Sequence, residues 1–201
     1  MDELDILLWI QGASPWMDGP MQAVSAVTAH SACWIAMAVL LMLSKRGRAT
    51  GTSMMLAMVL VLIIVDLAAK PLVGRDRPFE VYDFPLIVGA PSSYSFPSGH
   101  SAYAFACAAC IAMGCRRWAV PALAAAAVVA YSRLYLFVHW PTDVLAGALL
   151  GILIGVAAVR VVWRADVRSR CRSSTRCPRC RCLCGACRRS RRRTPRRRTR
   201  R

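Results

Sequence analysis

Long apolar runs separated by short polar segments form the main pattern along this chain. Five runs stand out, at residues 21–43, 53–69, 101–115, 118–138 and 144–163. A helix needs roughly 20 apolar residues to cross a hydrocarbon core about 30 Å thick, and the second and third runs are shorter than that. The pattern predicts an all-α fold, a multi-span transmembrane helical bundle of about five spans.

The first residues follow a different pattern. The stretch MDELDILLWIQGAS has acidic residues where a cleavable signal peptide carries basic ones, so we expect no such peptide. Its apolar side chains are too few to span a bilayer, and they predict a short interfacial helix at the membrane surface. Whether that helix is partly inserted stays open.

Charge divides the chain into two parts. The formal net charge is +17, but residues 1–163 hold ten of the 27 Lys and Arg and nine of the ten Asp and Glu. Residues 164–201 hold the other cations, all of them Arg. We predict a membrane-embedded domain at residues 1–163 and a disordered, Arg- and Cys-rich cytoplasmic tail at residues 164–201.

The tail leaves three interpretations open. Its cysteine pairs, Cys177 with Cys180 and Cys184 with Cys187, resemble zinc-binding spacing, but only three residues separate the pairs. Its arginines would also be attracted to anionic lipid, at about 1 kcal/mol each at best. The third interpretation is an extension without function. We expect no nucleic-acid partner, because the basic charge is confined to this segment.

The loops predict an orientation in a cell membrane. Basic residues follow the first, third and fifth runs, and by the positive-inside rule these segments are cytoplasmic. The segments at about residues 70–98 and 133–141 then face the outside, together with the amino terminus. We therefore expect a multi-pass protein whose carboxyl terminus is cytoplasmic.

Unusual polar residues gather on the predicted outer side. Each costs about 2.5 to 3.5 kcal/mol at the centre of a membrane helix, so several at one level need a reason. They are Lys70, Arg75, Arg77, Ser98, His100, Arg133, His139 and Asp143. They lie in three motifs, which are KPLVGRDRP at 70–78, PSGH at 97–100 and SRLYLFVHWPTD at 132–143.

These residue types suit a phosphate group. Lys70 offers a point charge, and Arg77 and Arg133 offer planar forks that bind phosphate through two parallel hydrogen bonds. Ser98 and Gly99 precede an apolar run, where the free N–H groups of a helix start favour an anion. Two histidines, His100 and His139, permit a covalent route. Acidic residues suited to Mg²⁺ are scattered, so we expect no metal and no other cofactor.

The order and spacing of the three motifs resemble the signature of the type-2 phosphatidic acid phosphatase superfamily. That family contains integral-membrane lipid phosphatases and soluble vanadium haloperoxidases, and five spans argue against the latter. The resemblance implies that His139 is the nucleophile and His100 the general acid. Asp143 would hold the imidazole of His139, although its place in the first turn of the last span also suits a structural role. The resemblance assigns no role to Arg75.

Among family members, bacterial undecaprenyl-diphosphatases resemble the chain most. They hydrolyse a polyprenyl diphosphate to the monophosphate and phosphate, which returns the carrier for cell-wall synthesis. A phosphatidic acid or phosphatidylglycerophosphate phosphatase is the alternative within the family. A non-catalytic membrane protein whose basic tail binds anionic lipid or nucleic acid is the alternative from another class. The oligomeric state stays open.

Three packing features are also expected. Asp66 precedes Lys70 by one helical turn and predicts an ion pair. The stretch GALLGILIG at residues 147–155 offers two steps of small residues for close helix contact. Cys107, Cys110 and Cys115 accompany many alanines, so we interpret them as packing residues.

Overall fold

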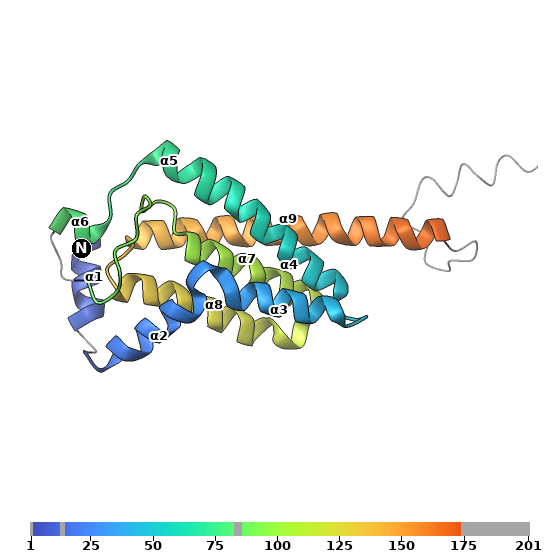
Figure 1. The fold of residues 1–201 in the computed structure, drawn as a ribbon, viewed down its shortest axis with the longest axis horizontal. Helices are drawn as coiled ribbons and strands as arrows, with labels where there is room; N and C mark the ends of the chain where they lie inside the picture. The colour runs from blue at the N-terminus through green and yellow to red at the C-terminus, as the bar shows by residue number, and fades with distance from the viewer. Residues whose placement is uncertain (1, 13–14, 83–85, 174–201) are drawn as a thin grey trace, which may run out of the picture. The chain divides into compact units, whose positions relative to one another are not determined.

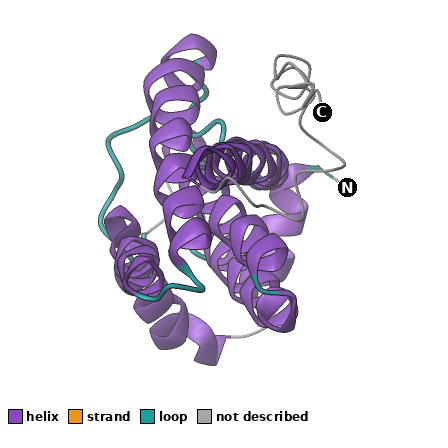
Figure 2. Cartoon of the chain, turned by 90° about the vertical axis from the view of Figure 1, so that its right-hand side faces the viewer, coloured by secondary structure: helices purple, strands orange, loops and turns teal. Residues whose placement is uncertain are grey.

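The computed structural model describes residues 2–12, 15–82 and 86–173, and this part contains helices and loops but no strand (Figure 2). The predicted all-α architecture is confirmed. Contacts divide the chain into Met1–Val162 and Trp163–Arg201.

The elements, labelled in Figure 1, are α1 Glu3–Gly12, η1 Pro15–Met17, α2 Asp18–Thr28, η2 Ala29–Ser31, α3 Ala32–Leu43, α4 Arg48–Val61, η3 Leu62–Ala69, α5 Lys70–Val73, α6 Pro78–Tyr82, α7 Gly99–Gly114, η4 Arg116–Trp118, α8 Ala119–Tyr135 and α9 Pro141–Ser173.

Three helical stretches are long and apolar enough to cross a membrane, at Arg48–Tyr82, Arg116–Tyr135 and Pro141–Val167. Helices α2 and α3 together would make a fourth, with a bend of 53° between them. Ser31, whose φ of 59° is left-handed, lies at that bend. Helix α7 has 16 residues, too few to meet the same test. The count of five spans therefore stays a prediction.

Helix α7 lies at the centre of the bundle and packs against α4 and α8. Most of its side chains are buried, on all sides of the helix, and many of them are alanine. Cys107 and Cys110 belong to this core, and Cys110 Sγ lies 3.6 Å from the carbonyl oxygen of Gly155. The packing role predicted for these two cysteines is confirmed. A helix surrounded on all sides by other helices needs small residues for close approach.

Helix α9 approaches α7 through a row of glycines. A Cβ added to Gly147, Gly151 or Gly155 would come within 2.3 to 2.5 Å of the carbonyl oxygens of Ser98, Ala102 and Ala106. Such distances leave no room for a side chain. The contact predicted from the small residues of this stretch is confirmed, and it fixes the first turn of α7 against α9.

Helix α8 ends earlier than the apolar pattern indicates. The fourth run was expected to continue to Val138, but the helix stops at Tyr135. The N–H of Phe137 bonds the carbonyl of Leu134 and the N–H of Val138 bonds that of Arg133, with Phe137 left-handed at φ 57°. These bonds form a Schellman motif, which ends a helix and redirects the chain. Apolar composition alone does not reveal it, because the terminating residue is not glycine.

The amino-terminal segment forms the short helix that its sequence predicts. Leu7 of α1 is fully buried in a cluster with Phe137 and Trp140, beside the loop that follows α8. Figure 1 shows α1, α5 and α6 at the same end of the bundle. Helix α1 thus packs on the protein there, and its position at a membrane surface stays a prediction. The disordered tail was predicted to begin at residue 164, but helix α9 continues to Ser173. Residues 174–201, which include the cysteines of the zinc alternative, lie outside the described residues.

Candidate active site

The predicted site residues come from separate segments that meet at this end of the bundle. Lys70 begins α5, Arg77 precedes α6, and Ser98, Gly99 and His100 form the start of α7. Arg133 lies in the last turn of α8, His139 in the following loop and Asp143 in the first turn of α9. The charges of Arg133, His139, Lys70 and Arg77 all act on the imidazole of His100. The structure therefore brings the two histidines and the three cations together, and Asp143 joins them through its contacts with His139 and Ser98.

His139 is buried beside two oxygen atoms. Its Nδ1 lies 3.4 Å from Ser95 Oγ and 3.8 Å from Asp143 Oδ2. The pKa of His139 is lowered to about 4, chiefly by burial and also by the charges of Arg77 and Lys70, while Asp143 opposes the shift. Burial disfavours the charged imidazolium, so the ring is neutral at pH 7. A neutral imidazole is the form that can act as a nucleophile.

Asp143 is fully buried, and the chain supplies three donors to its carboxylate. Oδ2 accepts the backbone N–H of Trp140 at 3.0 Å and a short hydrogen bond from the Ser95 hydroxyl. Oδ1 accepts Nη1 of Arg75 at 2.7 Å. The bond to Trp140 caps the start of α9, where Pro141 stands at the first helical position. The 3.8 Å to His139 exceeds a hydrogen bond, and Ser95 contacts both residues.

Arg75 was among the polar residues expected on the outer side, but the sequence assigned it no role. Besides Asp143, its guanidinium donates to Thr142 Oγ1 at 2.6 Å and to Glu3 Oε2 at 2.5 Å. It also lies over the ring of Trp140, 5.2 Å from the centroid. Helix α1 is thereby attached to the start of α9. Glu3 also accepts the N–H of Thr142, and although burial raises the pKa of Glu3, the bonds from Thr142 and Arg75 lower it overall.

Lys70 is positioned by the predicted ion pair, which the structure confirms. Its Nζ lies 2.7 Å from Asp66 Oδ1, and Asp66 also accepts the hydroxyl of Tyr103 at 2.8 Å. A Cβ added to Gly99 would lie 3.4 Å from the Lys70 ammonium. The same Cβ would lie only 3.0 Å from Asp66 Oδ1, so the glycine at the start of α7 leaves room for the ion pair of Asp66 and Lys70.

The guanidinium groups of Arg77 and Arg133 already donate hydrogen bonds within the chain. Arg77, only 2% exposed, donates Nε to the carbonyl of Ser93 and Nη1 to that of Val138, both at 2.7 Å. It thus ties the loop before α7 to the loop after α8. Arg133 is 4% exposed and donates Nε and Nη2 to Ser132 Oγ at 3.2 and 3.1 Å. Both cations are held in place before any ligand binds.

The start of α7 is arranged differently from a capped helix. Ser98 is the N-cap residue, yet its side chain makes no capping hydrogen bond. Its backbone N–H donates to the carbonyl of Asp143 at 3.0 Å, and its hydroxyl accepts from Ser101 Oγ at 3.1 Å. The Ser98 side chain therefore does not occupy the first N–H groups of α7, which suits an anion at this helix start.

Metal-binding clusters were also sought. Within the described residues, no three His, Cys, Asp or Glu side chains converge in a way that would hold a metal ion. The carboxylates of Asp143 and Asp66 instead accept hydrogen bonds from neighbouring side chains.

Known proteins resemble the chain in both sequence and structure. It is 33% identical over 130 residues to an undecaprenyl-diphosphatase of Sulfolobus acidocaldarius, covering 64% of this chain and 63% of that protein. A putative undecaprenyl-diphosphatase of Escherichia coli, YbjG, is 40% identical over 93 residues, 45% of this chain and 46% of the relative. The chain thus spans less than two thirds of these two relatives. A decaprenylphosphoryl-5-phosphoribose phosphatase of Mycolicibacterium smegmatis is 34% identical over 151 residues, 71% of this chain and 79% of the relative.

Among solved structures, Aquifex aeolicus LpxE is similar with a TM-score of 0.69 and 25% identity, covering 78% of this chain and 94% of that protein. A PAP2-type phosphatidylglycerolphosphate phosphatase of Bacillus subtilis, described as transmembrane, gives a TM-score of 0.61 and 26% identity over 82% of this chain and 86% of its own. The family model of the PAP2 superfamily matches residues 49–166, more than half of the chain and all three motifs. The chain therefore belongs to the PAP2 superfamily.

Proposed function

We propose that this protein is a membrane-embedded lipid phosphatase that acts through a phosphohistidine intermediate. One observation carries the proposal: the cations Lys70, Arg77 and Arg133 share one end of an apolar bundle with two histidines. A bound phosphate needs several hydrogen-bond donors at once. The phosphate group of a membrane lipid lies at the boundary between the membrane and water. The similarity to several lipid phosphatases supports the same reaction class.

In the first step, His139 attacks phosphorus. A neutral ring nitrogen forms the N–P bond while the bond from phosphorus to the lipid oxygen breaks. His100 gives that oxygen a proton, which avoids the release of an alkoxide or an unprotonated phosphate. Burial and the surrounding cations lower the pKa of His100 in the free site, so the bound phosphate has to supply this proton or offset the positive charge. Asp143, with Ser95 beside it, holds His139 in the orientation for attack and stabilises the positive charge that the ring acquires.

In the second step, water cleaves the phosphohistidine. His100, now neutral, accepts a proton from the water, whose oxygen bonds to phosphorus while the N–P bond breaks. The products are inorganic phosphate and free His139. Lys70, Arg77, Arg133 and the N–H groups at Ser98 and Gly99 would bind the phosphoryl oxygens through both steps. No metal takes part in this scheme.

The substrate we favour is a polyprenyl diphosphate such as undecaprenyl diphosphate. The similarity to two proteins named as undecaprenyl-diphosphatases supports it. A lipid phosphomonoester is the second candidate, because the decaprenylphosphoryl-5-phosphoribose phosphatase aligns over larger shares of both chains. Phosphatidic acid and phosphatidylglycerophosphate belong to that second class.

The test is phosphate release by the purified full chain, in EDTA, from undecaprenyl diphosphate and from phosphatidic acid. We expect release by wild type and a loss of at least 1,000-fold in His139→Ala, while His30→Ala, the control at the histidine of η2, retains it. An active His139→Ala variant would refute the assignment of the nucleophile. Loss of wild-type activity in EDTA would refute the scheme without a metal.

The tail and the orientation are tested separately. A chain lacking residues 164–201 should retain hydrolysis, whereas a protein that works only through its basic tail would lose its function. Reporter fusions at each terminus should place the amino terminus outside and the carboxyl terminus in the cytoplasm. Fusions that report both ends on one side would contradict the predicted count of five spans.

A further inference from the structure

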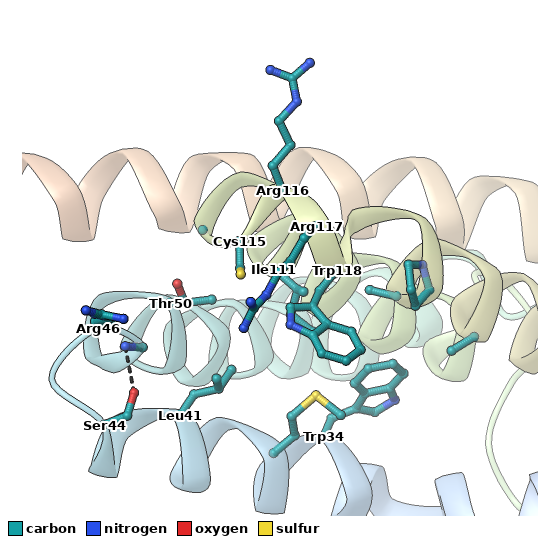
Figure 3. A pocket seen from close by; sticks show the side chains of 16 residues that line it. Trp34, Leu41, Ser44, Arg46, Thr50, Ile111, Cys115, Arg116, Arg117 and Trp118 are labelled. Carbon is teal, nitrogen blue, oxygen red and sulfur yellow. Dashed lines mark hydrogen bonds between the residues drawn. The ribbon is translucent and has the colours of Figure 1, made fainter.

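A second pocket lies far from the histidines. It has a volume of about 990 Å³ and is lined by residues of α3, the α3–α4 turn, α4, the end of α7, η4 and α8 (Figure 3). Helix α7 connects the two places, with His100 in its first turn and Gly114, which lines the pocket, at its end. At 1.5 Å per residue, about 20 Å separate them along the helix axis. The pocket is therefore no part of the proposed phosphatase site.

The walls of this pocket are apolar and aromatic. Trp34 and Leu41 line it from α3, Ile111 from α7 and Pro121 from α8. Trp118 completes the wall and is half exposed, while Trp34 is almost fully buried. An apolar surface of this kind, on the outside of a helical bundle, suits a hydrocarbon chain. Tryptophan is enriched where such a surface meets the lipid headgroups.

Arginine side chains also line this pocket, and they form no ion pair with a described acidic residue. Arg46, Arg116 and Arg117 line the pocket, and none of the described lining residues is acidic. None of the three forms an ion pair with a described residue. Figure 3 shows Arg117 extending into the pocket toward Thr50, whereas Arg116 points away. The guanidinium of Arg117 also lies 5.9 Å from the ring centroid of Trp118.

We propose that this pocket binds an anionic phospholipid from the leaflet opposite the proposed catalytic end. Its phosphodiester would accept hydrogen bonds from Arg46 and Arg117, and one acyl chain would lie along Trp34, Leu41 and Ile111. Free phosphate would leave the apolar wall uncovered, and a zwitterionic lipid would neutralise the two guanidinium groups less well. Basic pockets between membrane helices are known to take anionic headgroups. The proposal does not depend on the phosphatase function.

The test measures lipid retention by the full chain in a neutral detergent. Dioleoylphosphatidylglycerol is the probe, because its phosphodiester carries no terminal phosphate for hydrolysis, and bound lipid is counted by native mass spectrometry. Dioleoylphosphatidylcholine and sodium phosphate are the comparison ligands. We expect phosphatidylglycerol to bind at least tenfold more tightly than phosphatidylcholine, and phosphate not to displace it. Equal binding of both lipids, or displacement by phosphate, would overturn the proposal.

Matched variants locate the lipid. The double variant Arg46→Gln with Arg117→Gln should bind phosphatidylglycerol at least tenfold more weakly, while Arg48→Gln, an exposed arginine at the start of α4 that does not line the pocket, should stay within twofold of wild type. Ala125→Trp narrows the pocket at an exposed lining position without changing charge, and should weaken binding by a similar factor. Wild-type binding by the double variant would overturn the assignment of this pocket, whatever the hydrolytic activity of the protein.

Discussion

Nη1 of Arg75 lies 2.7 Å from Oδ1 of Asp143, in the first turn of α9. The same guanidinium bonds Thr142 and Glu3, so one cation connects the segment after α5, the start of α9 and the amino-terminal helix. Asp143 in turn lies beside Ser95 and His139. We therefore predict that Arg75 is a positioning residue, which acts on the proposed nucleophile through the neighbouring carboxylate of Asp143.

Replacing Arg75 should slow the chemical step more than it weakens substrate binding. Hydrogen bonds to charged groups contribute about 1.5 to 3 kcal/mol each, so Arg75→Gln should lower kcat about tenfold or more. We expect KM to stay within threefold, because Arg75 already has three partners in the chain. Steady-state phosphate release measures both constants. Arg75→Lys keeps the charge and should recover part of the rate.

Arg160→Gln is the control for a lost arginine, since Arg160 is exposed on α9. It should retain wild-type kinetics. If Arg75→Gln also retained the wild-type kcat, the positioning role would be wrong. If instead KM rose more than tenfold at constant kcat, Arg75 would belong to the phosphate-binding set.

Ser95 gives a second prediction about the same carboxylate. Its hydroxyl donates to Asp143 and lies 3.4 Å from Nδ1 of His139, so Ser95→Ala removes a donor from a fully buried oxygen. A buried polar group left unsatisfied costs about 1 to 3 kcal/mol, and we expect kcat to fall about tenfold. Ser92→Ala, at an exposed position of the same loop, should behave as wild type. Equal rates in Ser95→Ala and Ser92→Ala would refute this role.

The sequence predicted the features that depend on local pattern. Apolar runs predicted the helices, the three motifs identified the residues that the fold brings together, and the glycines of α9 indicated its contact with α7. The Asp66–Lys70 pair followed from helical spacing alone. These features depend on spacing within one helix, on small residues that allow close helix contact, or on charged residues that a membrane tolerates poorly.

Features that depend on distant partners could not be predicted in this way. Arg75 contacts Glu3, 72 residues earlier, and Ser95 contacts Asp143, 48 residues later, so no local spacing relates them. Arg77 was expected to bind phosphate, and the sequence did not indicate that it also bonds the carbonyls of Ser93 and Val138. Helix α8 ends because Phe137 adopts a left-handed backbone conformation. The sequence rarely indicates this conformation in a residue other than glycine.

The contact between α7 and α9 predicts a stability effect. A Cβ at position 151 would lie 2.3 Å from the carbonyl oxygen of Ala102, so Gly151→Ala forces the helices apart. Overpacking of this kind costs typically about 1 to 3 kcal/mol. Gly151→Ala should lower the temperature of thermal unfolding in detergent by several degrees, on the order of 1 kcal/mol per 2 to 4 °C. Leu149→Ala, on the exposed side of α9, should change it much less. Unchanged unfolding of Gly151→Ala would contradict the observed helix contact.

The protonation of His139 gives the last prediction. Burial lowers its pKa to about 4, so the ring should stay neutral as the pH falls from 8 and become half protonated near pH 4. An ordinary histidine would be half protonated near pH 6.5. The measurement is NMR titration of ¹³C-labelled histidine in the variant His30→Gln with His100→Gln, which leaves His139 as the sole histidine. A further change of His139→Gln identifies its signal by removing it. A midpoint near pH 6.5 would show that water reaches His139, and the neutral nucleophile would then be only partly populated at pH 7.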